Sequence, residues 1–208
     1  MKKQLSALLI GNGQCPSPEL LQRLAAKADF ILAADGGAQK AAQAGVTPDK
    51  IIGDFDSLEP ASCWPKEKLL HIPRQDNTDL EKALDYLQDN HFTAVTIVGG
   101  TGGRWDFSIG NFLSAYPYLD KMDICFAADS WQIFPLIKPA QKTVRPGTRV
   151  SLIPVSPCQN VTLKGLKYPL ANARLELGRT GRTLSNLSVQ TQIGVHFTNG
   201  YLLLYIED

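Results

Sequence analysis

Cysteine and histidine are scarce in this chain. Its 208 residues include four cysteines and three histidines, which lie far apart in the sequence without paired spacing. They are Cys15, Cys63, Cys125 and Cys158, and His71, His91 and His196. This spacing argues against a zinc site and against a disulfide framework. We therefore expect each histidine to be a surface or half-buried residue rather than a metal ligand.

An excess of charge and a long apolar run are also missing. The formal net charge is +1, so bulk electrostatics indicate neither a nucleic-acid nor a membrane partner. No apolar run approaches the roughly 18 residues of a membrane span. Lys2 and Lys3 lead into a strand-like segment without a cleavage site. Hydrophobic residues make up 44% of the chain and charged residues 20%, which is typical of a globular protein. We expect a cytoplasmic protein.

The pattern of apolar residues predicts two domains. Up to residue 137, short apolar runs alternate with helical patterns, which predicts an α/β domain with a mostly parallel sheet and flanking helices. Its strands are expected at 5–10, 30–34, 51–52, 69–72, 93–98 and 123–128. Residues 138–208 show only short strand-like pieces, at 150–155, 160–163, 184–189, 195–198 and 201–206, with a hairpin signal at Thr198-Asn199-Gly200. We expect a smaller β-sandwich domain there.

Two carboxylates follow the third predicted strand, in Gly53-Asp54-Phe55-Asp56-Ser57. Residues two apart in extended chain point to the same side, so Asp54 and Asp56 aim together. Like charges at that separation repel unless a proton or a cation lies between them. A surface turn would also explain the pair, but a divalent cation is the simplest partner.

Other acidic residues follow the remaining strands of the predicted sheet. Asp35 ends the second strand, where open α/β sheets place ligands, although a plain turn also accounts for it. Thr78 and Glu81 form a capping-box pattern, so a helix is expected to begin at Thr78. Asp79 then lies in the first turn, where a carboxylate is favourable for the helix dipole alone. That account gives no reason for Asp76, Arg74 and Lys82, all of which a phosphate site would use.

A glycine-rich segment follows the fifth predicted strand. Gly99-Gly100-Thr101-Gly102-Gly103 leaves backbone N–H groups accessible to an anion before a helix that is expected to begin near Asp106. The Gly-Lys-Ser/Thr ending of a P-loop is absent, so Arg104 would supply the fixed positive charge. The first strand ends in Gly11-Asn12-Gly13, but the third glycine of a dinucleotide fingerprint is missing and we set a Rossmann cofactor site aside.

Carboxylates with almost no histidine or cysteine indicate a hard cation, and Mg²⁺ binds through a few carboxylates together with substrate phosphates. Arg and Lys in the same set are suited to phosphate. The residues therefore predict a magnesium-dependent enzyme that acts on a nucleotide.

Six segments in order along the chain resemble the thiamine pyrophosphokinase (thiamine diphosphokinase) family. They are Asp35-Gly36-Gly37, Gly53 to Ser57, Gln75 to Asp79 with Lys82, Gly99 to Asp106, Gly165 to Leu170, and Ser185-Asn186. The resemblance implies a homodimer, with the active site at the subunit interface, that transfers pyrophosphate from ATP to the hydroxyethyl group of thiamine and releases AMP.

The resemblance also implies roles for particular residues. Magnesium ligands would be Asp35, Asp54, Asp56 and Asp79, and catalysis would involve Asp54, Asp56, Asp79 and Arg104. ATP would contact Gln75, Asp76, Thr78, Lys82 and Arg104. Thiamine would lie near Asp106, Ser185 and Asn186, although an ordinary β-turn also explains the last two. Phe107 departs from the family, where bacterial members often carry histidine, so we place no catalytic role there.

Two other functions agree with the same residues. A metal-dependent phosphohydrolase could use Asp54 and Asp56 as an Asp-x-Asp pair, and a non-catalytic protein could bind thiamine or a nucleotide. Release of AMP together with thiamine diphosphate would distinguish the transferase from both.

Overall fold

The computed structural model describes residues 4–55, 64–73, 76–179, 181 and 183–207. They form two compact units that divide between Asp129 and Ser130. The sequence analysis predicted the domain boundary at residue 137, whereas the structure groups β7 (Trp131–Leu136) with the second unit, because β7 pairs with β14 (Leu202–Glu207) along its whole length. No helix in the described ranges is long and apolar enough to cross a membrane.

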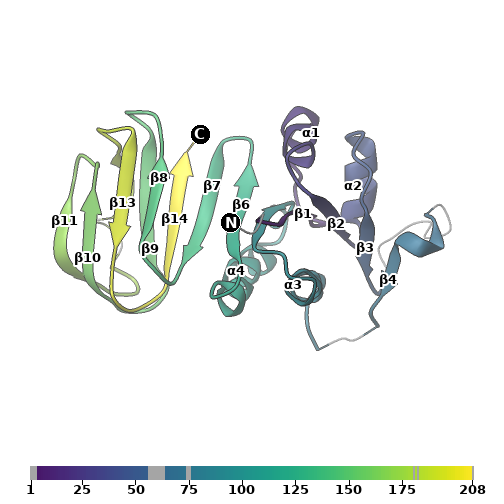
Figure 1. The fold of residues 1–208 in the computed structure, drawn as a ribbon. Helices are drawn as coiled ribbons and strands as arrows, with labels where there is room; N and C mark the ends of the chain where they lie inside the picture. The colour runs from purple at the N-terminus through teal and green to yellow at the C-terminus, as the bar shows by residue number, and fades with distance from the viewer. Residues whose placement is uncertain (1–3, 56–63, 74–75, 180, 182, 208) are drawn as a thin grey trace. The chain divides into compact units, whose positions relative to one another are not determined.

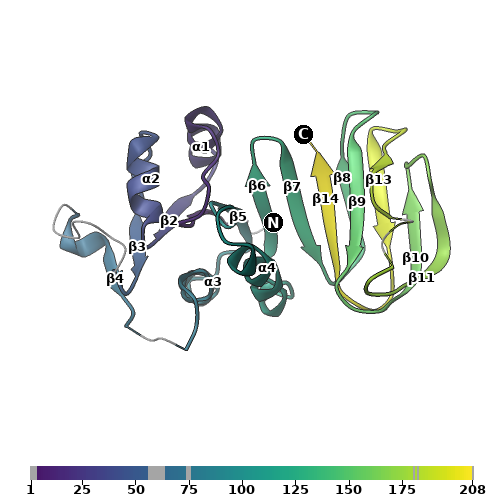
Figure 2. The same cartoon turned by 180° about the vertical axis from the view of Figure 1, so that it is seen from behind.

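The first unit is built on a parallel sheet with the strand order β6-β5-β1-β2-β3-β4. Its elements are β1 (Ser6–Ile10), α1 (Pro18–Ala25), β2 (Phe30–Ala34), α2 (Gly37–Gln43), β3 (Lys50–Gly53), the 3-10 helix η2 (Lys66–Lys68), β4 (Leu69–His71), α3 (Asp79–Asp89), β5 (Ala94–Val98), α4 (Trp105–Ser114), the 3-10 helix η3 (Tyr116–Tyr118) and β6 (Asp123–Ala128). Helices α1 and α2 lie on one face of the sheet, and α3 and α4 lie on the other (Figures 1 and 2). The predicted α/β architecture of this domain is confirmed.

Local chemistry sets the beginnings of two helices. The Ser17 side chain accepts a hydrogen bond from the Leu20 N–H, and Pro18 is the first residue of α1, as the sequence predicted. Thr78 and Glu81 form the predicted capping box at the start of α3, with each side chain bonded to the other's backbone N–H. Both helices therefore begin where an N-terminal backbone donor finds a side-chain acceptor.

The second unit contains two antiparallel sheets, β12-β9-β14-β7 and β11-β10-β13-β8. Its strands are β7 (Trp131–Leu136), β8 (Ala140–Thr143), β9 (Arg149–Pro154), β10 (Cys158–Lys164), β11 (Leu170–Leu175), β12 (Asn186–Leu187), β13 (Gln192–His196) and β14 (Leu202–Glu207). One core cluster draws residues from both sheets, among them Leu152 and Leu204 from one and Val161 and Val195 from the other. This is the layered arrangement of a sandwich, and the predicted β-sandwich is confirmed.

The hairpin prediction at Thr198-Asn199-Gly200 is wrong. The strands on either side of this turn belong to different sheets, since β13 pairs with β8 and β10 while β14 pairs with β7 and β9. The turn instead contacts β10, where the Thr198 N–H donates to the Gln159 carbonyl at 3.1 Å. The Gly-containing turn therefore connects a strand of one sheet to a strand of the other.

Candidate active site

A cavity of about 450 Å³ lies at the carboxyl ends of the strands of the first unit. Residues that follow β1, β2, β3 and β5 line it, together with the first residues of α3 and α4. The strand order reverses between β1 and β5, because β2 lies on the far side of β1 and β6 on the far side of β5. Ligands of open α/β sheets bind at such a switch point, so the topology alone marks this cavity as a binding site.

Two glycine-containing segments meet at the switch point. The N–H groups of Gly11, Gly13 and Gln14 donate to the carbonyls of Val98, Gly99 and Thr101 at 2.8, 2.7 and 2.6 Å. A Cβ atom at Gly13 would lie 2.4 Å from the Thr101 carbonyl oxygen, which is too close for any other residue. The turn after β1 therefore holds the glycine-rich segment after β5 by direct backbone contact. The sequence had set this turn aside, whereas in the structure it lines the cavity.

Asp35 is buried at the end of β2, with a φ angle of 46° and 3% exposure. The two glycines after it make room for the turn that follows β1. A Cβ atom at Gly36 would lie 2.5 Å from Oδ1 of Asn12, and one at Gly37 would lie 2.2 Å from the Ile10 carbonyl oxygen. The Asp-Gly-Gly segment thus places a carboxylate in the wall of the cavity and lets two backbone segments approach.

Asp54 follows β3 and lines the same cavity. A Cβ atom at Gly53 would lie 3.2 Å from Cβ of Asp35, so the chain that leads to Asp54 passes directly beside Asp35. Adjacent parallel strands bring these two acidic residues, which are remote in sequence, to one edge of the sheet.

The start of α3 contributes Thr78 and Asp79 to the cavity. The Lys82 ammonium donates to Oδ1 of Asp79 at 2.8 Å, and only 3% of the Lys82 side chain is exposed. One turn of helix therefore pairs a buried cation with a carboxylate that faces the cavity. Asp79 is engaged by Lys82 as well as placed favourably for the helix dipole.

Arg104 lines the cavity before α4 and is bound to Asp106. Its Nη2 and Nε atoms donate to the two carboxylate oxygens at 2.5 and 3.2 Å. This hydrogen bond is the main reason that the pKa of Asp106 falls below its ordinary value and that the pKa of Arg104 rises. The guanidinium also lies over the Phe107 ring, 4.4 Å from the ring centre, so Phe107 forms part of the cavity wall.

The structure gathers five of the predicted site residues around this cavity: Asp35, Asp54, Thr78, Asp79 and Arg104. Lys82 is connected to the cavity by its ion pair with Asp79, and Asp106 is connected to it by its ion pair with Arg104. Asp76 is exposed and is absent from the described cavity lining. Asp56 and Gln75 lie outside the described residues.

Ser185 and Asn186 belong to the second unit and differ in their surroundings. Asn186 is buried, at 2% exposure. Its Oδ1 accepts from the Tyr168 N–H at 3.0 Å, and its Nδ2 donates to the Tyr168 carbonyl at 2.7 Å. These bonds tie β12 to the Gly165 to Leu170 segment, which gives Asn186 a structural role. Ser185 is exposed. Thiamine binding by this pair stays a prediction.

Three polar residues of the site were missed by the sequence analysis. Asn12, Ser108 and Asn111 all line the cavity. Asn111 Nδ2 donates to the Gly100 carbonyl at 2.6 Å, and Ser108 Oγ accepts from the Gly102 N–H at 3.3 Å, so α4 holds the glycine-rich segment from its other side. The position of Asn12, two residues after the end of the first strand, was a usable signal, because parallel strands end at the same edge.

The carboxylates suit a magnesium ion. Within the residues that the structure describes, no three His, Cys, Asp or Glu side chains come together closely enough to hold an ion by themselves. Asp35, Asp54 and Asp79 nevertheless line one cavity and offer only oxygen ligands. Mg²⁺ commonly uses one or two carboxylates and completes its shell with water and substrate phosphates. The donor set therefore fits Mg²⁺ bound together with a nucleotide.

Comparison with known proteins identifies relatives over nearly the whole chain. The model of the thiamin pyrophosphokinase catalytic domain matches residues 21–126, and the model of the thiamin pyrophosphokinase vitamin B1 binding domain matches residues 137–202. The chain is 31% identical to the thiamine pyrophosphokinase of Bacillus subtilis over 182 residues, which cover 82% of this chain and 83% of the relative.

Solved structures give the same result. The fold resembles the crystal structure of thiamin pyrophosphokinase from Geobacillus thermodenitrificans with a TM-score of 0.84 and 26% identity, over 98% of both chains. It also matches the fold of the Bacillus subtilis enzyme with a TM-score of 0.84, over 97% of this chain and 98% of that one. The chain belongs to the thiamine pyrophosphokinase family.

Proposed function

We propose that this protein transfers pyrophosphate from ATP to the hydroxyethyl oxygen of thiamine and releases thiamine diphosphate and AMP. The observation that carries the proposal is the match of both family domains, catalytic and vitamin B1 binding, in order along one chain. The cavity supports it, because carboxylates from neighbouring strand ends and a guanidinium surround a space at the switch point. Neither the hydrolase nor the non-catalytic alternative has such support.

In the proposed reaction the thiamine oxygen attacks the β-phosphorus, and the bond between that phosphorus and the oxygen of AMP breaks. Asp35, Asp54 and Asp79 would hold Mg²⁺, with Asp56 predicted as a fourth ligand. A bound Mg²⁺ would neutralise charge on the phosphate oxygens. Asp54 or Asp56 would accept the hydroxyl proton. Positioning by the cavity walls contributes more than proton removal, because a loose transition state requires little of it early.

The nucleotide would lie along the segments that surround the cavity. We place its phosphates near Arg104 and Thr78, which line the cavity, and near Lys82 through its ion pair with Asp79. Gln75 and Asp76 stay predicted ATP contacts. Thiamine would lie near Asp106 of one subunit and Ser185 and Asn186 of the other, as the family resemblance implies.

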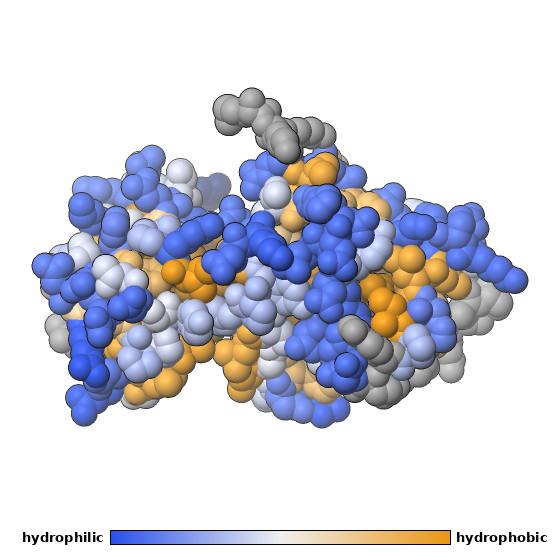
Figure 3. Space-filling view, turned by 60° about the horizontal axis from the view of Figure 1, so that its bottom comes forward, coloured by the Kyte–Doolittle hydropathy of each residue, from blue (hydrophilic) through white to orange (hydrophobic). Residues whose placement is uncertain are grey.

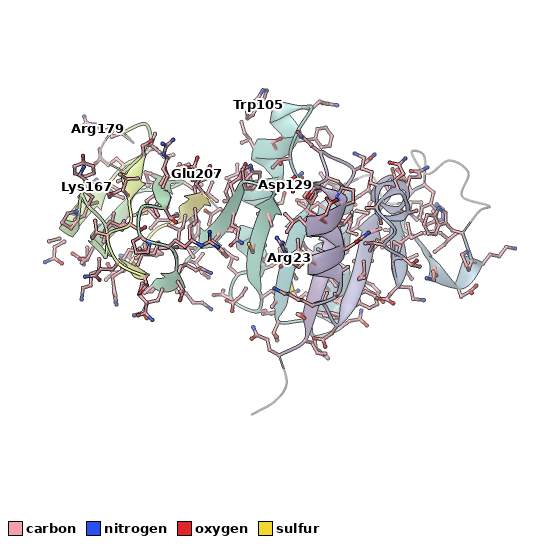
Figure 4. The ribbon with its side chains drawn as sticks, turned by 90° about the horizontal axis from the view of Figure 1, so that it is seen from above. Arg23, Trp105, Asp129, Lys167, Arg179 and Glu207 are labelled. Carbon is pink, nitrogen blue, oxygen red and sulfur yellow. The ribbon has the colours of Figure 1, made fainter. Side chains whose placement is uncertain are left out.

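A homodimer is part of the proposal. Helix α4 supports it with a row of apolar side chains at a spacing of four residues, Trp105, Ile109 and Leu113, which are 81%, 57% and 45% exposed. Figure 4 shows Trp105 projecting outward at the end of its helix, and apolar residues form separate areas on the largely hydrophilic face of Figure 3. An apolar row of this kind is typical of an interaction surface.

The dimer can be tested by substitution in this row. Ile109→Asp is expected to shift the protein to monomer in sedimentation experiments, whereas Leu5→Asp, at an exposed leucine outside α4, is expected to leave its assembly unchanged. Cytoplasmic localisation stays a prediction.

The test is product analysis with purified protein, ATP, Mg²⁺ and thiamine. We expect AMP and thiamine diphosphate in equal amounts. Asp54→Asn should lower turnover by orders of magnitude, while Asp89→Asn, at the exposed end of α3, should leave it unchanged. Inorganic phosphate formed without thiamine would indicate the hydrolase, and binding without turnover would indicate the non-catalytic protein.

A further inference from the structure

Lys40 in α2 reaches back to the turn that follows β1. Its ammonium donates hydrogen bonds to the backbone carbonyls of Asn12 and Gly13, which are 28 and 27 residues away in the sequence. The side chain is half-buried, and both acceptors are neutral peptide groups. Hydrogen bonds from a charged donor are stronger than those between neutral groups, so this contact fixes the conformation of the turn.

The turn that Lys40 holds is the one that supports the glycine-rich segment after β5. Gly13 donates to the Gly99 carbonyl at 2.7 Å, and the next residue donates to the Thr101 carbonyl at 2.6 Å. Lys40 is absent from the described residues that line the cavity, whereas Asn12, Gly13 and Gly99 are all present there. Lys40 is therefore placed to act on the cavity through the turn rather than by touching its contents.

The turn held by Lys40 carries the polar side chain of Asn12 at the cavity wall. It is exposed, lines the cavity and lies against Gly36, immediately after the buried carboxylate of Asp35. Its backbone carbonyl is one of the two acceptors of Lys40. An amide in a wall otherwise rich in carboxylates supplies a neutral N–H donor, which binds phosphate oxygen without adding negative charge.

We propose that Asn12 contacts the polyphosphate of the nucleotide and that Lys40 is the positioning residue that holds Asn12 and the adjoining turn in place. The proposal rests on the function proposed above, because it takes ATP as the occupant of the cavity. It assigns to the turn after β1 a role in binding the nucleotide, in addition to the strand-end carboxylates.

The experiment compares steady-state kinetics of the full chain and its variants, with ATP and thiamine varied separately. Lys40→Met keeps the apolar stem and removes the donors, and Lys27→Met is the matched control at an exposed lysine after α1. We expect Lys40→Met to raise KM for ATP about tenfold or more, with KM for thiamine changed less than twofold. Lys27→Met should match the wild type, and Lys40→Arg should recover most of the loss.

A double-mutant cycle tests whether Lys40 acts through Asn12. Asn12→Ala should raise KM for ATP by itself, and Lys40→Met combined with Asn12→Ala should be little worse than Lys40→Met alone. Additive effects would overturn the proposal, because they would mean that Lys40 acts independently of Asn12. A normal KM for ATP in Lys40→Met would overturn it as well.

Two controls separate the possible failures. If the wild type releases no AMP, the proposed function fails, whereas an active wild type with a normal Lys40→Met variant refutes only the present inference. If circular dichroism shows that Lys40→Met does not fold, Lys40→Gln, which is uncharged and one atom shorter and so loses the charged donor, replaces it. An ATP-specific rise in KM for Lys40→Gln supports the proposal, and its absence overturns it.

Discussion

The close approach of Gly37 to β1 leads to a prediction that opposes helix propensity. Gly37 is the first residue of α2, and alanine within a helix is favoured over glycine by about 1 kcal/mol. A Cβ atom there, however, would lie 2.2 Å from the Ile10 carbonyl oxygen, which is backbone and cannot rotate away. Forcing extra atoms into a packed region costs about 1–3 kcal/mol. The short contact is with backbone on all sides, since the Ile10 carbonyl carbon at 2.9 Å and the Gly11 carbonyl oxygen at 3.0 Å are also close, so the cost lies in the upper half of that range. We expect Gly37→Ala to destabilise the first unit by about 1–2 kcal/mol net.

Gly110 provides the matched control. It lies within α4, and a Cβ atom there would meet nothing within 4 Å. Gly110→Ala should therefore stabilise the protein by about 0.5–1 kcal/mol through helix propensity alone. The same substitution in two helices is thus expected to change stability in opposite directions.

Differential scanning calorimetry is the suitable assay, because it resolves the transitions of the two units if they unfold separately. A change of 1 kcal/mol shifts Tm by about 3–5 °C for a unit of this size. Gly37→Ala should lower Tm and Gly110→Ala should raise it. A Gly37→Ala variant as stable as the wild type would show that β1 and α2 can separate at no cost, and it would refute the packing explanation of the Asp-Gly-Gly segment.

Three further predictions concern ionisable groups. Asp79→Ala should destabilise the protein by about 2–3 kcal/mol in chemical denaturation and Lys82→Met by less, because only the first leaves a buried charge without its partner. Burial raises the pKa of the Cys15 thiol while the charge of Lys40 lowers it. Alkylation of Cys15, measured by peptide mass spectrometry, should therefore be slower in the folded than in the unfolded protein until the pH exceeds the raised pKa. The Lys40→Met substitution should slow the alkylation further, because it removes the charge that lowers the pKa. The stability that the protonated thiol contributes is lost as the pH rises through that raised pKa. Asp129→Ala should cost about 1–2 kcal/mol in denaturant titrations, since its carboxylate accepts from both the N–H and the hydroxyl of Ser17 at the start of α1. An unchanged midpoint would contradict this.

Features that depend on neighbouring residues could be predicted from the sequence. The Ser17 cap, the capping box at Thr78 and the strand that ends at Ala128 are all found where local patterns placed them. The sheet edge could also be predicted, because parallel strands end on one side and their terminal residues must gather there.

Strands with weak local signals were missed. The β8 segment, Ala140–Thr143, is polar and half exposed, so it has no apolar alternation to detect. In β7 the run is interrupted by Pro135, which normally argues against a paired strand. In β11 the pattern is broken at Asn172, where φ is 48°. Tertiary pairing, which a single sequence does not reveal, forms these three strands.

The carboxylates of the site could be predicted, but the contacts that support them could not. Asp35 and Asp54 were identified because each follows a strand. The contact of Lys40 with Asn12 and that of Gly13 with Gly99 join segments that are far apart in sequence and carry no shared motif. Similarly, the buried position of Asn186 follows from its bonds to Tyr168, not from its local turn.

The charges of the site lead to a last prediction about metal and nucleotide. Among the described residues, Arg104 lines the cavity and Lys82 lies behind Asp79, and both cations already have carboxylate partners, Asp106 and Asp79 respectively. Polyphosphate entering near Asp35 would meet further negative charge, and two like charges 4 Å apart repel by about 1 kcal/mol in water and about 4 kcal/mol near a protein surface. The summed repulsion of two or three such like-charge pairs exceeds the attraction from cations that already have carboxylate partners. ATP should therefore bind well only together with a divalent ion. Titration calorimetry should show at least a hundredfold weaker affinity for ATP in EDTA than in Mg²⁺. Equal affinities would mean that the carboxylates do not face the phosphates, and the assignment of Asp35 and Asp54 as ligands would then be wrong.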